Sequence, residues 1–263
     1  MKGLVRFFVA FASCLALACS LYGQPDGDAA VESQPGKPAS SAGMADHFGL
    51  GVKVGLLGAG AEVAARLNPH SNVRAGFNVL GYSRSFDKDG INYDGHLSFR
   101  TIEAHYDYYP WARSFHISGG LLDYIGNPIT ANALLPGGPN GGSSFTLGGQ
   151  QYYTQTNSAF ASGRVNFNQV SPTVTFGWGN LVRENHHFTF PVELGIAFQG
   201  SPKSTLGVGG TVCTSPTDPS TCVNAATDPI VQSNVVSEQA KLNRSMKPFR
   251  FYPIISFGFG YKF

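Results

Sequence analysis

The sequence predicts an all-β protein, a transmembrane antiparallel up-and-down β-barrel of about eight strands, with a short helix in the last long loop. The main observation is the strict alternation of the last eight residues, which puts Phe257, Phe259, Tyr261 and Phe263 on one face. A strand that is apolar on one face and polar or small on the other suits a barrel wall between lipid and a polar interior. The composition agrees, since 33 of the 263 residues are glycine and only 13% are charged.

A secretory signal peptide is predicted over residues 1–23. Lys2 and Arg6 precede an apolar run over 7–17, and small residues follow it. The run is shorter than the roughly 20 residues of a membrane-spanning helix, whereas it fits a cleaved signal. Lipid attachment at Cys19 is an alternative to simple cleavage.

Residues 24–46 are expected to form a disordered periplasmic leader, and residues 47–263 the barrel domain. The leader holds too few large apolar side chains to offset the entropy lost on ordering. Removal of Lys2 and Arg6 leaves 16 of the 18 Lys and Arg residues against 16 Asp and Glu residues. A neutral chain lacks the excess of cations that phosphate backbones require, so nucleic acid is excluded as a partner.

The first two strands are predicted from a change of apolar face. Apolar residues occupy even positions over 48–56 and odd positions over 59–67. Because a one-residue slip exchanges the two faces of a strand, either a bulge or a turn must lie at Gly58–Gly60.

The third strand is expected at about 73–84 and the fourth at about 91–109. In the fourth, the apolar face moves from Phe99 to Ile102. We therefore expect a bulge near Arg100–Thr101.

The remaining strands are expected at about 116–125, 161–179, 188–198 and 249–263. The sixth strand also changes face, between Phe167 and Val174, with an irregularity at Pro172. Short turns alternate with two long connections, 127–160 and 201–247. Since such barrels have short periplasmic turns, long outer loops and an even strand number, a turn at Gly58–Gly60 and eight strands fit best.

The interior of an eight-stranded barrel is just wide enough for its own side chains. Buried charges are tolerated only when they are paired, so we expect a salt-bridged polar plug. A narrow conduit or small-solute site lined by arginines is the alternative. The charged residues expected to face inward are Lys53, Glu62, Arg66, Arg74, Arg84, Asp94, Arg100, Glu103, Arg164, Glu193 and Arg250.

Catalytic and metal sites are not expected. His116 and Ser118 have the spacing of the His-x-Ser pair in outer-membrane lipid A deacylases, but Gly119 stands where those enzymes have Asn. His186 and His187 are adjacent and would point to opposite faces, which does not suit one metal ion. No cofactor is predicted.

The second long connection carries two local signals. Cys213 and Cys222 are expected to form a disulfide, because the exported chain enters an oxidising space. Asp228 before Pro229 marks a helix start, and Val231, Val235, Leu242 and Met246 follow at helical spacing. Any recognition is expected in the two long connections, with the aromatic residues Phe145, Tyr152 and Tyr153 as candidate contacts.

The C-terminal pattern Ser256, Gly258, Tyr261, Phe263 resembles the signal read by the outer-membrane assembly machinery of Gram-negative bacteria. Stretches such as Arg74–Asn78 and Asp107–Pro110 make the chain similar to small eight-stranded barrels of the OmpA/OmpW-like superfamily. The resemblance implies a monomer in the outer membrane whose partners are lipid, the assembly machinery and a small solute or surface ligand. It implies a non-catalytic structural or surface-interaction role, with a narrow porin-like channel, or more remotely a lipid hydrolase, as alternatives.

Overall fold

The computed structural model describes residues 47–88, 91–126, 129–138, 140–184 and 186–263. The expected signal peptide, leader, Cys14 and Cys19 lie outside these residues.

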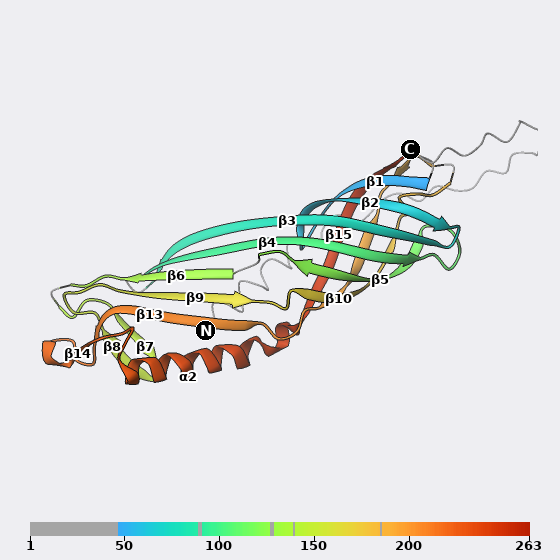
Figure 1. Ribbon diagram of the computed structural model, residues 1–263. Helices are drawn as coiled ribbons and strands as arrows, with labels where there is room; N and C mark the ends of the chain where they lie inside the picture. The colour runs from blue at the N-terminus through green and yellow to red at the C-terminus, as the bar shows by residue number, and fades with distance from the viewer. Residues whose placement is uncertain (1–46, 89–90, 127–128, 139, 185) are drawn as a thin grey trace, which may run out of the picture. The chain divides into compact units, whose positions relative to one another are not determined.

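Eight antiparallel strands close into a barrel, as predicted (Figure 1). Each strand pairs with the next in the order given below, and β15 pairs with β1 to close the ring. The strands are β1 (Phe48–Gly55), β2 (Gly58–Asn68), β3 (Ser71–Lys88), β4 (Ile91–Tyr108), β5 (Phe115–Tyr124), β10 (Val170–Trp178), β12 (Val192–Phe198) and β15 (Phe251–Lys262).

The first two strands form a hairpin rather than one kinked strand. Gly55 pairs with Gly58, so the chain reverses at Leu56 and Leu57. Gly58 has a φ of +103°, a conformation that residues with a Cβ rarely adopt, and this explains the glycine at the turn.

Apolar side chains cover the outside of the barrel. On β1, Leu50, Val52 and Val54 are exposed while Lys53 between them is buried, and Phe257, Phe259 and Tyr261 are exposed on β15. This alternation is that of a lipid-facing wall around a polar interior. In the described part of the chain, no helix has the length and apolar character to span a membrane. Short turns join β2 to β3 and β4 to β5, and by the usual rule this end should face the periplasm. The orientation stays a prediction, and we call this end the periplasmic end.

The prediction of a bulge near Arg100–Thr101 is wrong. Strands β3 and β4 pair without a shift from Ser71↔Tyr108 to Lys88↔Ile91. Phe99 therefore shares the inward face with Thr101, and both are buried. The apparent change of face arises because apolar side chains also fill one end of the interior.

The change of face expected between Phe167 and Val174 has the same cause, an apolar side chain inside the barrel. The chain forms two strands, β9 (Ala159–Asn166) and β10, and the break lies at 167–169. Pro172 pairs regularly with Leu121. Phe167 packs inside the barrel rather than against lipid.

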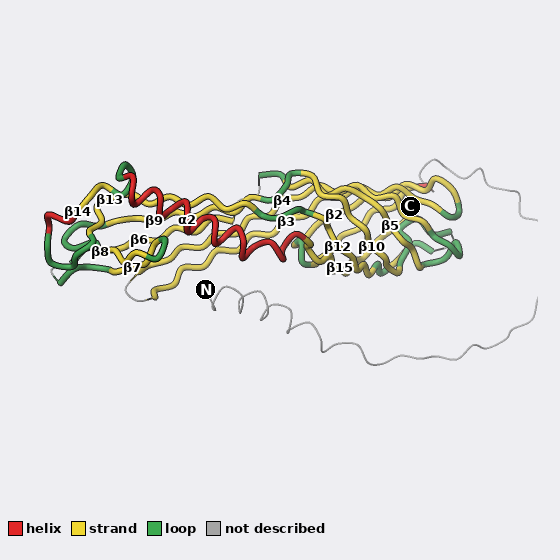
Figure 2. The backbone as a smooth tube through the Cα atoms, turned by 90° about the horizontal axis from the view of Figure 1, so that it is seen from below, coloured by secondary structure: helices red, strands yellow, loops and turns green. Residues whose placement is uncertain are grey.

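The two long connections are largely folded, and the sequence did not indicate their β-strands. Beyond the barrel, β3 and β4 continue into a sheet in which β4, β6, β9 and β13 are neighbours (Figures 1 and 2). We call this sheet and the elements packed on it the outer extension. Its further elements are β6 (Ile129–Leu135), β7 (Ser144–Leu147), β8 (Gln150–Tyr153), β13 (Lys203–Cys213), η2 (Pro219–Thr221) and β14 (Cys222–Asn224), and β11 (Phe188–Thr189) pairs with β15 at the barrel.

The predicted helix is confirmed as α2 (Pro229–Met246), followed by η3 (Lys247–Arg250). Asp228 caps it by accepting hydrogen bonds from the backbone N–H groups of Ile230 and Val231. The helix lies along the sheet in Figure 2, against β13 and β7, and not in the barrel mouth. Its Asn243 and Gln239 side chains accept hydrogen bonds from the N–H groups of Ser204 and Leu206, so they satisfy part of the β13 edge.

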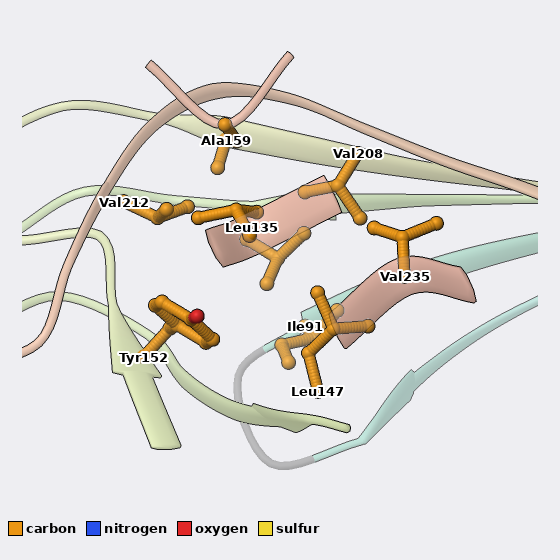
Figure 3. Packing of buried hydrophobic residues seen from close by; sticks show 10 residues of the cluster. Ile91, Leu135, Leu147, Tyr152, Ala159, Val208, Val212 and Val235 are labelled. Carbon is orange, nitrogen blue, oxygen red and sulfur yellow. The ribbon is translucent and has the colours of Figure 1, made fainter. Parts of the chain in front are cut away.

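An apolar core holds the outer extension together (Figure 3). Val231 and Val235 of α2 pack against residues of β6, β8 and β13, including the fully buried Val212. Tyr152 is only 1% exposed, and Phe145 stacks on it with ring centroids 5.8 Å apart. Tyr152 is therefore a core residue, and its expected role as a surface contact is wrong. Phe145 is partly buried against this core.

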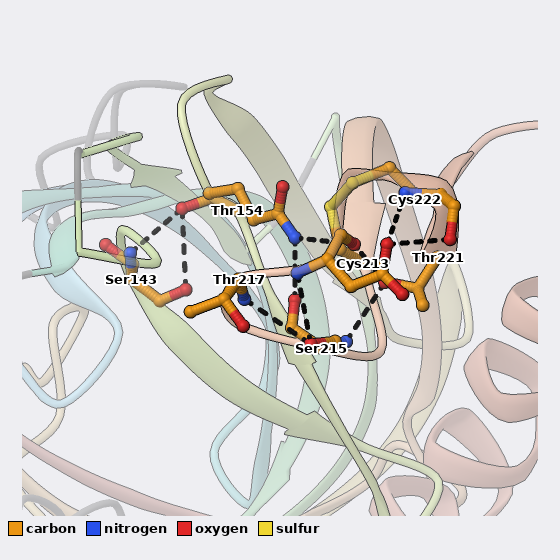
Figure 4. The surroundings of a disulfide bond; sticks show 10 residues. Ser143, Thr154, Cys213, Ser215, Thr217, Thr221 and Cys222 are labelled. Carbon is orange, nitrogen blue, oxygen red and sulfur yellow. Dashed lines mark hydrogen bonds between the residues drawn. A yellow bond between two sulfur atoms is a disulfide. The ribbon is translucent and has the colours of Figure 1, made fainter.

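The expected disulfide joins Cys213 and Cys222, which face each other across β13 and β14 (Figure 4). Hydrogen bonds order the intervening turn. Ser220 donates to the Asp218 carboxylate from its side chain and its backbone, at 2.7 and 2.9 Å, and these bonds lower the pKa of Asp218.

Thiol labelling on whole cells tests this clamp and the assigned topology. A membrane-impermeant maleimide should label Cys213 and Cys222 only after reduction, because the two sulfurs are bonded to each other and the predicted orientation puts them outside the cell. A Cys213→Ser variant should expose Cys222 to the reagent without reduction. Labelling of the unmodified chain without reductant contradicts the disulfide, and labelling only from the periplasmic side contradicts the orientation.

Candidate functional site

The barrel interior contains a buried group of charged side chains, which we call the central ion cluster. They come from five strands, and each is no more than 7% exposed. The cluster consists of Lys53, Glu62, Arg74, Glu103, Asp107 and Glu193. Alternation on β1, β2, β3, β4 and β12 brings these residues together, because every second side chain points inward.

Arg74 is the centre of the cluster. Its Nη1 and Nη2 donate to the two carboxylate oxygens of Glu193, at 3.2 and 2.6 Å. Nη1 also lies 3.1 Å from Glu62 Oε2, and Nη2 lies 3.2 Å from Asp107 Oδ1. One guanidinium thus holds three strands of the wall to its own strand through charge-assisted bonds.

Lys53 joins the rest of the cluster to this centre. Its Nζ donates to Glu103 and lies 3.2 Å from Glu62 Oε2, the oxygen that also contacts Arg74. The second oxygen of Glu103 accepts a hydrogen bond of 3.2 Å from Asn78. Glu62 therefore bridges the two cations.

The cluster holds two cations and four carboxylates, and neutral donors satisfy part of the surplus negative charge. Ser118 donates to Asp107 Oδ1 and Thr175 donates to Glu193 Oε1, each at 2.6 Å. A buried carboxylate is tolerable only with such partners. The cluster is accordingly a connected polar network that crosses the interior.

An aromatic layer lies on the outer side of the cluster. The Phe99 ring is 6.1 Å from that of Tyr124, 5.7 Å from Phe167 and 6.1 Å from Tyr252, between centroids. Leu122 in the same group is fully buried. The tyrosine hydroxyls are satisfied, since Tyr124 donates to Gln199 and Tyr252 to the Leu56 carbonyl.

A second apolar layer lies at the periplasmic end. The turn after β10 places Leu181 and Val182, 5% and 0% exposed, against Ala64. Gly49 and Gly260 face this turn, and a Cβ at either position would collide with Leu181. The interior is thus filled at three levels in succession: apolar, ionic and aromatic.

Five of the predicted inward charges are exposed instead, and that part of the prediction is wrong. Arg100 alternates with the buried Phe99 and Thr101 and so points outward, because the expected bulge is absent. The guanidinium of Arg250 lies 4.7 Å from the centre of the Phe251 ring. The other three lie in the outer extension, beyond the barrel: Arg84, Asp94 and Arg164.

Arg66 lies at the periplasmic end, where it forms an ion pair of 2.6 Å with Glu184. Of the six arginines predicted to face inward, Arg74 alone is buried in the interior. An arginine-lined conduit therefore does not fit the structure.

The two side chains of the His-x-Ser pair bond to different partners. Ser118 donates to Asp107, whereas His116 Nδ1 lies 3.3 Å from the Ser114 carbonyl oxygen and its ring lies against Tyr109. His187 contacts the Lys262 carbonyl at 3.2 Å and stacks on Tyr261. Within the described residues, no three His, Cys, Asp or Glu side chains gather to hold a metal ion.

The residues of the expected insertion signal lie on β15 and just after it. Tyr261 and Phe263 are exposed on the lipid side, while Ser256 faces inward beside Glu193 in register. The N–H of Gly258 donates to the Pro191 carbonyl at 2.8 Å. Recognition by the assembly machinery stays a prediction.

Similar folds occur among solved structures. CarO from Acinetobacter baumannii superposes with a TM-score of 0.50 at 19% identity, over 82% of this chain and 97% of that chain. CarO2 from the same organism gives 0.51 at 16% identity, over 82% and 98%. No protein-family model and no curated protein matches the chain. At these identities the likeness concerns the fold, which with the apolar wall is that of an outer-membrane β-barrel.

Proposed function

We propose that this outer-membrane barrel is a closed, non-catalytic support that presents its outer extension as an interaction surface. The observation that carries the proposal is the filled interior. The central ion cluster lies between the Leu181–Val182 layer and the aromatic layer around Phe99, so side chains occupy the route through the barrel.

The outer extension supports a role in recognition. It has its own apolar core, a helix packed on its sheet and a disulfide, and these features give a rigid surface rather than mobile loops. Recognition residues are commonly carried on segments positioned by a rigid scaffold. The ligand would contact the exposed faces of this extension.

Planar-bilayer recording tests the closed interior. The purified, refolded protein should give no channel currents when it is added in an amount at which a general porin inserts many times. Ions would have to pass through the buried, desolvated central ion cluster. Leu181→Ser should remain silent, since the central ion cluster still fills the barrel. Regular unitary currents from the unmodified chain would refute the proposal and favour the narrow channel.

Membership of the OmpA/OmpW-like superfamily belongs to the same proposal and rests on the strand number and small barrel size. A lipid hydrolase is disfavoured because Ser118 and His116 bond to different partners.

A further inference from the structure

A cavity of about 670 Å³ opens at the periplasmic end of the barrel wall, apart from the interior. It lies between the turn that follows β4 and the turn that follows β10. Its lining consists of Trp111, Arg113, Ser114, Phe115 and Arg183. Two guanidinium groups and two aromatic rings thus meet in one cavity.

Backbone and side-chain bonds fix the two turns to each other. The N–H of Gly179 donates to the Ser114 carbonyl at 2.9 Å, and Arg183 Nη1 donates to Ser114 Oγ at 3.2 Å. Ala112 has a φ of +48°, which turns the chain sharply between Trp111 and Arg113. The Arg183 guanidinium is therefore bonded to the neighbouring turn, and the backbone of its own turn places Arg113 at the cavity.

The charge at this cavity is positive. Glu184 follows Arg183 directly, but its carboxylate is engaged with Arg66 at 2.6 Å. Arg113 is exposed, and Arg183 is partly exposed. Guanidinium groups present planar pairs of donors that match phosphate oxygens, so the cavity suits a phosphate group.

The aromatic wall of the cavity continues onto the lipid-facing surface. Trp111 contacts Phe115 at 5.4 Å, Phe115 contacts Trp178 at 5.5 Å, and Trp178 contacts Phe176 at 6.2 Å, between ring centroids. Trp111, Trp178 and Phe176 are 67%, 49% and 44% exposed. A ligand with its phosphate at the arginines would therefore have apolar surface beside it for its acyl chains, at the level where aromatic residues line such barrels.

We propose that this cavity binds the phosphate headgroup of a glycerophospholipid of the periplasmic leaflet. Arg113 and Arg183 contact the phosphate, and the acyl chains lie along Phe115, Trp178 and Phe176. The site is separate from the interior, so it does not depend on whether the barrel conducts.

Tryptophan quenching tests the proposal, because the chain has only two tryptophans, Trp111 and Trp178. A Trp178→Phe variant keeps a ring at the wall and leaves Trp111 as the reporter. The folded variant in detergent micelles is titrated with dibrominated phosphatidylglycerol and, separately, with dibrominated diacylglycerol, which lacks the phosphate. The phospholipid should reach half-maximal quenching at an about five-fold lower mole fraction, the factor of a favourable exposed ion pair.

In the same background, Arg113→Gln with Arg183→Gln should remove the preference for the phospholipid, and Arg113→Gln alone should reduce it. Arg244→Gln, an exposed arginine of α2, is the matched control and should leave it unchanged. Heat-modifiable gel migration verifies that each variant is folded. Equal quenching by the two lipids overturns the proposal. An equal loss of the phospholipid preference in the Arg244→Gln control also overturns it. Displacement of the phospholipid by millimolar glycerol phosphate would also overturn it, because the site would then take a soluble anion.

Discussion

Replacing Arg74 by methionine should destabilise the barrel by about 3–5 kcal/mol, the range found when one partner of a buried ion pair is removed. Arg74 is 6% exposed and contacts Glu62, Asp107 and Glu193. Methionine retains much of the side-chain volume, so the main loss is the charge. Three carboxylates from three strands would then face one another without their shared cation.

Urea unfolding in detergent micelles, followed by heat-modifiable gel migration, measures this change. Arg74→Met combined with Glu193→Gln should be more stable than Arg74→Met alone, by about 1 kcal/mol or more, because one unpaired carboxylate is removed. Arg244→Met, at an exposed position of α2, should change the free energy of unfolding by less than about 0.5 kcal/mol. A cost below about 1 kcal/mol for Arg74→Met would mean that water screens the cluster, and the interior would then be hydrated rather than filled.

The wall of the barrel was predictable from the sequence because short turns fix its register. Alternation located the strands, and the requirement for an even number favoured a turn over a bulge at Gly58–Gly60. The turn lies slightly earlier, at Leu56–Leu57, and Gly58 is already the first residue of β2. Where short turns join a strand to its neighbours, the sequence also predicted the inward-facing residues correctly. Lys53, Glu62 and Arg74 are examples. There the alternation of the strand alone decides which side chains are buried.

Alternation gave the wrong face for residues in the part of the interior that is lined by apolar side chains. Phe99 and Phe167 were assigned to lipid because aromatic residues usually mark the outer face, and each assignment then required an irregularity. A change of strand register and an apolar layer inside the barrel give the same pattern in a single sequence. The unbroken pairing of β3 with β4 distinguishes the two.

The outer extension was missed for a different reason. Its sheet depends on pairings between distant segments, such as Ile129 with Val165 and Lys203 with Asn166. Glycine, serine and threonine in these segments weaken the alternation that marks a strand. The helix was recognisable because its cap at Asp228 and its 3.6-residue period are local signals.

Replacing Phe99 by alanine should cost about 3–5 kcal/mol, as for a phenylalanine removed from a packed core. Phe99 is 4% exposed and contacts the rings of Tyr124, Phe167 and Tyr252. Its removal leaves a cavity that these three rings can fill only in part, because they are held by β5, by β15 and by the segment between β9 and β10. Phe99→Leu should cost less, because it keeps much of the apolar volume.

Phe259→Ala is the matched control, since Phe259 is 41% exposed on the lipid side and contacts only Phe188 and Phe190 among the ring pairs of the described residues. Lipid can take the place of its side chain, so its loss should cost about 1–2 kcal/mol. Urea unfolding of both variants in the same detergent compares the two positions. Equal costs would place Phe99 in a lipid-like environment, and the bulge near Arg100 would then be required after all. A clearly larger cost at Phe99 means that this ring helps to close the barrel from inside.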